Sequence, residues 1–253
     1  NALTIRGLVD SYKSTKDPIF LNKALLINSS LSKTMIDNNI IRHTSSSPAE
    51  VLFFEDYSYY IDALIGLYEI TFDEKYLKFA DELTVFSNEK FKEESGFYRF
   101  STNQESLFAD TLINLQDGVT PSANSVMNFN LFRLGHFNGN KEYLLHSKTM
   151  INNVSETIKD RVTDHLLWLN NSHNYSQKFY EIAISGNNAI AKAEELMDEY
   201  LPNALVAASK SVSELYLLKD RYFKDETYIY VCVDNTCKFP VTKVLKALEL
   251  MKD

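Results

Sequence analysis

Apolar residues recur with the 3.6-residue period of an amphipathic helix over most of the chain. In the clearest stretch, from Asp56 to Thr71, the apolar positions that share one helical face are Tyr57, Tyr60, Ile61, Leu64, Leu67 and Tyr68. Similar patterns extend from Ala2 to Ser14 and from Ala123 to Phe137. These three stretches are therefore predicted to be long helices with one buried face.

A polar cap recurs shortly after each of these helices. The cap is Asp17, Asp73 or Asn140, and in each case an aromatic residue follows three positions later and a leucine comes next. Because short polar side chains accept hydrogen bonds at helix N-termini, each cap marks the start of a second helix. The repeat is therefore an αα-hairpin, and we expect three hairpins in succession.

A second polar position recurs 16 or 17 residues before each cap and is occupied by Asn1, Asp56 and Asn124. One interpretation is an ordinary N-cap at the start of the first helix of each hairpin. The other is that these N-termini open on one side of a ring of hairpins and surround a shared pocket. The pattern leaves both interpretations open.

The segments outside the hairpins predict short strands and a separate C-terminal unit. In the linkers, weak alternation favours strands at 40–44 and 96–101, and a further helix is expected at about 162–175. After residue 177, strands are predicted at 179–186, 204–208 and 228–233, and helices at 189–200 and 241–251. We therefore divide the chain into a helical-hairpin region, 1–176, and a small α/β unit, 177–253.

The composition strengthens the helical prediction and excludes several classes. Glycine (7) and proline (5) together make up under 5% of the 253 residues, whereas about 12% is usual. Since turns and bulges need these residues, many-stranded β architectures are disfavoured and a mainly α fold is expected. The hydrophobic content of 45% argues against global disorder.

The charge and the cysteine count bear on partners and location. The net charge of −8 leaves no basic stripe for nucleic acid, and no apolar run approaches the about 20 residues that span a bilayer. Two cysteines are too few for a disulfide scaffold, so we expect a cytoplasmic protein. The chain starts without Met and as though inside a helix, which predicts a fragment of a longer protein.

Glu55, Asp56 and Tyr57 at the start of the second hairpin are the first candidate site. Successive helical residues point about 100° apart, so Glu55 and Asp56 cannot face one pocket as a matched pair. The repeat selects Asp56 as the cavity-facing carboxylate, suited to acid–base work or to binding sugar hydroxyls. The alternative is an acidic residue that is stabilised by the helix dipole.

The loop before the third hairpin is the strongest candidate for a ligand site, because it concentrates scarce residue types. It contains Asp117, Gly118 and Pro121, followed by the polar residues Ser122, Asn124 and Ser125. Capping alone would need only one of these polar groups, so we expect a ligand to use the others. Asp56 and Asp117 would then supply the two carboxylates of a glycosidase.

Other residue patterns indicate no metal site and no cofactor. The five histidines lack metal-ligand spacing, and Cys232 and Cys237 lack a second pair of ligands. The two cysteines could form a redox pair, but their spacing favours structural thiols. The Gly186-Asn187-Asn188 turn lacks the further glycines of a dinucleotide-binding motif.

Four motifs carry a resemblance to a known family. They are Phe54–Ser58, the 117–125 loop, Tyr200-Leu201-Pro202-Asn203, and Val231-Cys232 followed by Cys237-x-x-Pro240-Val241. In this order they resemble the thioredoxin-domain-containing proteins related to the spermatogenesis-associated thioredoxin-like protein. That family has a thioredoxin-like domain followed by a helical toroid that is similar to six-hairpin glycosidases, N-acylglucosamine 2-epimerases and glucuronyl hydrolases.

The resemblance covers only the C-terminal part of such proteins, so with three hairpins the α/α toroid would be an incomplete ring. Val119-Thr120 and Ala123 also depart from the family's more frequent Ala-Glu and Gly. The resemblance implies a carbohydrate-binding or carbohydrate-active toroid, with glycosidase- or sugar-epimerase-like activity if it is an enzyme. The alternative is a non-catalytic scaffold that docks a thioredoxin-like domain or another protein.

Overall fold

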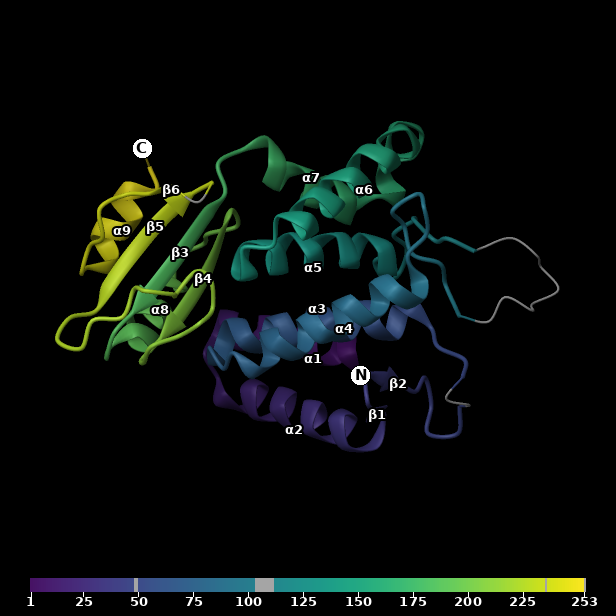
Figure 1. Cartoon of the computed structure of the whole chain (residues 1–253), viewed down its shortest axis with the longest axis horizontal. Coiled ribbons are helices and arrows are strands. Elements are labelled where there is room, and N and C mark those ends of the chain that lie inside the picture. Colours follow the sequence, from purple (N-terminus) through teal and green to yellow (C-terminus); the bar gives the residue numbers. More distant parts are fainter. Residues whose placement is uncertain (48–49, 103–111, 235, 253) are drawn as a thin grey trace. The chain divides into compact units, whose positions relative to one another are not determined.

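A computed structural model describes residues 1–47, 50–102, 112–234 and 236–252 of the chain (Figure 1). It contains two compact units. The first, here called the helical unit, comprises Asn1–Phe132 and Tyr143–Asn171. The second, the sheet unit, comprises Arg133–Glu142 and Ser172–Asp253. The predicted division at residue 176 remains a prediction. By its contacts, the segment 133–142, which holds the end of one helix and the start of the next, belongs to the second unit.

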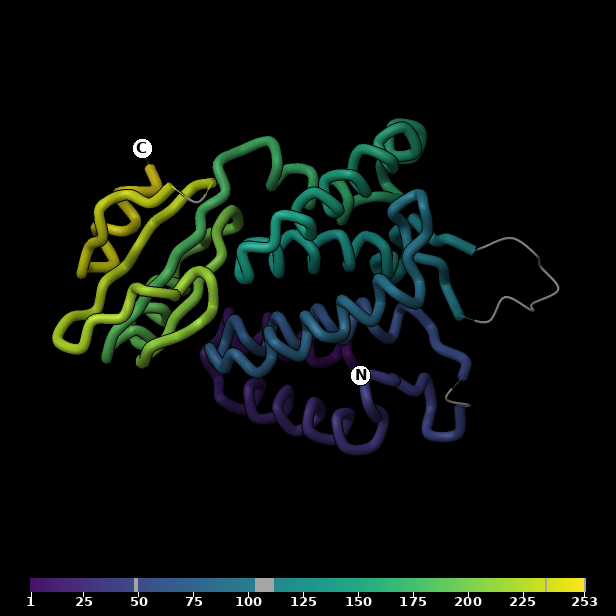
Figure 2. The backbone as a smooth tube through the Cα atoms, in the orientation of Figure 1, coloured from purple at the N-terminus to yellow at the C-terminus, as the bar shows by residue number. Residues whose placement is uncertain are grey.

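Three helical hairpins follow one another along the chain, as the path in Figure 2 shows. The helices are α1 (Ala2–Thr15), α2 (Pro18–Thr34), α3 (Phe54–Thr71), α4 (Lys75–Phe91), α5 (Ala123–Asn138), α6 (Lys141–Asp160) and α7 (Leu166–Ser176), with a 3-10 helix at Val162–Asp164. The strands β1 (Ile36–Asp37) and β2 (Ile40–Ile41) form a small antiparallel pair after α2.

The predicted hairpin repeat is confirmed by the caps themselves. The side-chain oxygens of Asp17, Asp73 and Asn140 each accept a hydrogen bond from the backbone N–H two residues later, at 2.9, 3.2 and 3.0 Å respectively. Each bond satisfies a donor that the first helical turn would otherwise leave unpaired. The first helices of the first two hairpins are not capped by the repeated polar residue, because Asn1 makes no side-chain cap and Asp56 lies inside the first turn of α3.

Helix α3 lies at the centre of the helical unit, in contact with both α1 and α4. Its buried face extends beyond the predicted stripe, and the ring of Phe54 stacks on Tyr98 with centroids 4.4 Å apart. Burying an aromatic side chain of this size contributes about 2–3 kcal/mol to folding. The start of α3 is therefore anchored firmly, which holds Glu55 and Asp56 in place at the surface.

Two predictions in this unit are wrong in detail. Residues 96–101 form isolated bridges rather than a strand, because the backbone of Tyr98 pairs with the side-chain amide of Asn124. The helix predicted at 162–175 is broken into a 3-10 turn and α7. The break occurs where the N–H of Leu167 donates to the carboxylate of Asp117.

The sheet unit contains a four-stranded mixed sheet in the order β4-β3-β5-β6. Its strands are β3 (Tyr180–Ser185), β4 (Ala204–Ser209), β5 (Tyr228–Val233) and β6 (Thr236–Cys237). Strand β3 is parallel to β4 and antiparallel to β5, and β5 is antiparallel to β6. The helices α8 (Ala189–Leu196) and α9 (Val244–Leu250) contact each other and the sheet, so they share one of its faces.

The predicted helices of the sheet unit are too long. Helix α8 ends at Leu196 rather than at residue 200, since the chain must turn before β4. Helix α9 begins only at Val244, because Val241 exchanges two backbone hydrogen bonds with Ile229 of β5. The mainly α class with a small C-terminal α/β unit is nevertheless confirmed. Within the described residues, no helix is both long and apolar enough to cross a membrane.

Candidate functional site

Two pockets that share Tyr59 lie at the start of α3, within the helical unit. The first has a volume of about 620 Å3 including open solvent, and its polar lining comes from Asn1, Arg42, His43 and Asp56. The second is smaller, about 440 Å3 on the same basis. Tyr59 lines both pockets, so its side chain forms the wall between them.

Asp56 is paired with His43 in the first pocket. The Nδ1 atom of His43 lies 3.0 Å from Oδ2 and 3.2 Å from Oδ1 of Asp56. Burial raises the pKa of the Asp56 carboxyl, and the hydrogen bond and charge of His43 partly oppose that shift. The Asp56 side chain keeps 21% of its surface exposed, so this carboxyl remains open to a ligand.

The second pocket is lined by Glu55 together with the rings of Tyr98 and Phe100 and by Thr120 of the loop before α5. The hydroxyl of Tyr59 donates a hydrogen bond of 2.7 Å to the backbone carbonyl of Pro121. Burial is also the main cause of the raised pKa of Tyr59, so this phenol remains a hydrogen-bond donor at neutral pH.

Glu55 and Asp56 therefore line different pockets, as the 100° turn between successive helical residues requires. The first-helix positions of the repeat also reach this region, since Asn1 and Asp56 line the first pocket and Asn124 lines the second. Whether these residues bind a ligand remains a prediction.

Tyr57, the third residue of the first candidate site, points into the core. Its hydroxyl donates to the carbonyl of Asn39 and accepts from the N–H of Ile41, both at 3.0 Å. Burial raises its pKa to about 12. The side chain thus ties the turn between β1 and β2 to α3, which places His43 beside Asp56.

Both carboxylate oxygens of Asp117 accept hydrogen bonds from other residues of the chain. One carboxylate oxygen accepts hydrogen bonds from the N–H of Ser122 at 2.9 Å and from Oγ of Ser125 at 2.6 Å. The other accepts from the N–H of Leu167 at 2.9 Å. This one carboxylate joins the start of α5 to the start of α7, and it does not line either pocket.

The polar residues that follow this loop, Ser122, Asn124 and Ser125, are buried and bonded internally. Ser122 accepts from the N–H of Ser125 at 3.0 Å, as an N-cap does. The amide of Asn124 accepts from the N–H of Tyr98 at 2.8 Å and donates to its carbonyl at 2.9 Å. The surplus of polar groups in this loop thus has structural partners, whatever ligand role is assigned to it.

Sequence reasoning missed His43, Arg42 and Tyr59. His43 fell inside a predicted strand and was considered only for metal spacing. Tyr59 offered a detectable signal, because it is an aromatic residue outside the apolar stripe of α3. In the described part of the chain, no three His, Cys, Asp or Glu side chains are grouped as metal ligands would be.

Comparison with solved structures finds partial similarity. An inactive variant of an α-1,6-mannanase of Salegentibacter, solved with α-1,6-mannotetrose, aligns with a TM-score of 0.48 and 16% identity. The alignment covers 59% of this chain and 44% of that one. No protein-family model matches the chain.

Comparison with curated sequences finds relatives over most of the chain. Human spermatogenesis-associated protein 20 is 27% identical over 214 residues, which cover 79% of this chain. An uncharacterised protein of Caenorhabditis elegans is 29% identical over 166 residues, or 62% of the chain. The aligned part is only 27% and 23% of these relatives' own lengths. The predicted resemblance is confirmed, because the chain is similar to spermatogenesis-associated protein 20 over most of its own length.

Proposed function

We propose that the two pockets at the start of α3 form a carbohydrate-binding site. The observation that carries the proposal is that Glu55 and Asp56, adjacent in sequence, line separate pockets on either side of Tyr59. Carboxylates accept hydrogen bonds from sugar hydroxyls, and an aromatic ring packs against the apolar face of a sugar ring. A ligand with hydroxyls at both ends would contact both carboxylates at once.

The finer proposal is acid–base catalysis by Asp56. A carboxyl group whose pKa is raised by burial can hold a proton for a leaving or ring oxygen, as the acid of a glycosidase does. His43, hydrogen-bonded to the same carboxyl, would orient it and exchange protons with it. In this scheme Asp117 positions the loop that carries Thr120 and does not contact the sugar.

Saturation-transfer NMR of the full chain against neutral sugars, short oligosaccharides and uronates tests the binding. For any sugar that the wild type binds, Asp56→Asn should weaken the binding about tenfold, because one charged hydrogen-bond acceptor is lost. Glu156→Gln is the matched control, since Glu156 is 80% exposed on α6 and pairs only with Lys159 among the contacts described. The same samples are assayed for release of reducing sugar, which tests the catalytic part.

Two results would contradict the proposal. One is the absence of saturation transfer from the protein to every sugar of the panel. The other is equal affinity of the wild type, Asp56→Asn and Glu156→Gln, which would place any bound sugar elsewhere.

A second proposal is a non-catalytic scaffold that docks a thioredoxin-like domain. Its support is the relation to a thioredoxin-domain family, of whose members the chain matches about a quarter of the length. Calorimetric titration of the chain with a separately expressed thioredoxin-like domain of such a homologue is the test. Saturable binding would support docking. The absence of any heat of binding at high concentrations of the chain and of the thioredoxin-like domain would exclude it.

A further inference from the structure

The sheet unit contains a disulfide that the carbohydrate-site proposal does not use. Cys232 of β5 and Cys237 of β6 are directly paired across the two strands and bonded to each other. The preference for structural thiols is therefore wrong, because the tight β5–β6 hairpin brings the two side chains together. Cys232 is only 1% exposed, whereas Cys237 lies on the exposed edge strand. An incoming thiol can therefore reach the bond from the Cys237 side.

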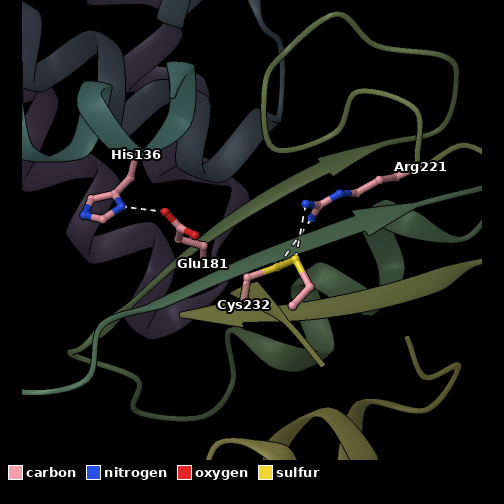
Figure 3. Close-up of a disulfide and its surroundings, with 5 residues drawn as sticks. His136, Glu181, Arg221 and Cys232 are labelled. Carbon is pink, nitrogen blue, oxygen red and sulfur yellow. Dashed lines mark hydrogen bonds and ion pairs between the residues drawn. A yellow bond between two sulfur atoms is a disulfide. The ribbon is translucent and has the colours of Figure 1, made fainter. Parts of the chain in front are cut away.

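The guanidinium of Arg221 lies against both sulfur atoms (Figure 3). Its Nη2 is 3.3 Å from Sγ of Cys237, and its Nη1 is 3.6 Å from Sγ of Cys232. The same group lies over the ring of Tyr230, 4.9 Å from the centroid, which holds it in place. A permanent positive charge at this distance does little for a neutral disulfide but strongly stabilises a thiolate.

A buried carboxylate on the neighbouring strand is already hydrogen-bonded to another group. Glu181 of β3 lies opposite Cys232 in the strand register and is 2% exposed. Its Oε1 is 2.7 Å from Nδ1 of His136, and Figure 3 shows the carboxylate directed at that imidazole while Arg221 is directed at the sulfurs. The Glu181 carboxylate therefore has its own hydrogen-bond partner, and its charge also acts on Arg221, where it raises the pKa of the guanidinium against the lowering effect of burial.

We propose that Cys232–Cys237 is an exchangeable disulfide, reduced by a protein dithiol, in which Arg221 is the positioning residue that stabilises the departing thiolate. A thiolate of the dithiol attacks Sγ of Cys237, forming a mixed disulfide as the bond between the two cysteines breaks. Cys232 leaves as a thiolate beside Arg221. The second thiol of the partner then loses its proton and attacks the partner's first sulfur atom in the mixed disulfide. This step releases Cys237 as a thiolate. Two electrons reach this chain, and the dithiol becomes a disulfide.

The exposed ring of Phe239 favours a protein as the reductant. It follows Cys237 by two residues and is 93% exposed. A large apolar side chain this close in sequence to the attacked sulfur can be contacted by a protein reductant, whereas a small thiol gains little from it. The reaction is independent of any sugar at the helical unit.

Reduction kinetics in dithiothreitol, a small dithiol probe, test the role of Arg221. Samples of the full chain are quenched in acid at intervals, alkylated with a maleimide and weighed by mass spectrometry. Arg221→Gln should shift the dithiothreitol equilibrium about tenfold toward the disulfide, as loss of one pKa unit of thiolate stabilisation predicts, and should slow reduction by a smaller factor of about three. The reduction rate and the equilibrium of Arg221→Lys should lie between those of the wild type and those of Arg221→Gln. Arg161→Gln, which removes a 65% exposed arginine of the helical unit, should match the wild type.

A single-cysteine variant keeps the proposal testable if Arg221→Gln fails to fold by circular dichroism. In Cys237→Ser, the Cys232 thiol should ionise at a pH below that of a free peptide thiol, as followed by the ultraviolet absorbance of the thiolate. The proposal is overturned if this thiol titrates like the free peptide. It is also overturned if folded Arg221→Gln equals the wild type in rate and equilibrium, or if the wild-type bond resists dithiothreitol until the protein is unfolded. Faster reduction by a protein dithiol, thioredoxin, than by equimolar dithiothreitol would support the choice of partner, and the reverse order would reject it.

Discussion

Asp56 and Asp117 are both aspartates at the entrance to a hairpin, yet their surroundings differ sharply. Asp117 accepts three hydrogen bonds from its own chain and lines no described pocket. Asp56 has one side-chain partner, His43, and lines an open pocket. The difference shows that a cluster of polar residues in a scarce Gly-Pro loop can serve the architecture entirely, whereas a carboxylate with few partners is the one left for a ligand.

The largest expected difference between the two aspartates is in the free energy of unfolding. Asp117→Ala should lower the free energy of unfolding by about 3 kcal/mol, because it leaves donors at the starts of two helices without their charged acceptor. Asp56→Ala should change it by less than about 1 kcal/mol. Urea denaturation followed by circular dichroism measures both. Equal losses for the two variants would show that Asp56 is as structural as Asp117.

The neighbouring tyrosines extend the comparison to an intermediate effect. Tyr57→Phe should cost about 1.5 kcal/mol, since its buried hydroxyl both donates to Asn39 and accepts from Ile41. Tyr59→Phe, the matched variant in the pocket wall, loses one half-exposed hydrogen bond and should cost about 0.5 kcal/mol. The same urea titrations decide the order, and a larger loss for Tyr59→Phe would contradict the assignment of Tyr57 to the core.

The smallest expected effect concerns pH. Because burial raises the pKa of Asp56 above its ordinary value of 3.8, the folded state holds this proton more tightly than the unfolded state. Its contribution to stability is fully present below pH 3.8 and is lost as pH rises through the raised value.

Asp56→Asn cannot ionise, so its stability relative to the wild type should increase between pH 3.8 and neutrality. Parallel urea titrations across this range measure the difference. A difference that is flat with pH would remove the electrostatic distinction between Asp56 and an ordinary surface carboxylate.

Much of the fold could be predicted because its signals are local. Asp17, Asp73 and Asn140 were identified as caps from positions that lie within one helical turn of their donors, and their hydrogen bonds are present. The strand at 228–233 was predicted with the bounds that β5 has. Helix α9 was misplaced at its start because Val241 pairs with Ile229, a partner that no local pattern reveals.

The candidate site could be predicted only in part for the same reason. The sequence pointed to Glu55 and Asp56, and the helical turn between them showed that they must face different directions. It did not reveal His43, which approaches Asp56 only because Tyr57 anchors the intervening β1–β2 turn. Asn124 is predicted to meet a ligand, and the sequence did not reveal that its amide also pairs with the backbone of Tyr98, 26 residues away.

The sequence by itself therefore determined the αα-hairpins, their caps and the helix positions of the two carboxylates. These depend on periodicity and on hydrogen bonds that span four residues or fewer. Only the tertiary structure decided which carboxylate remains open, and that Arg221 lies against the Cys232–Cys237 bond. Such pairings depend on which distant segments pack together, and the burial of apolar faces that drives packing is non-directional.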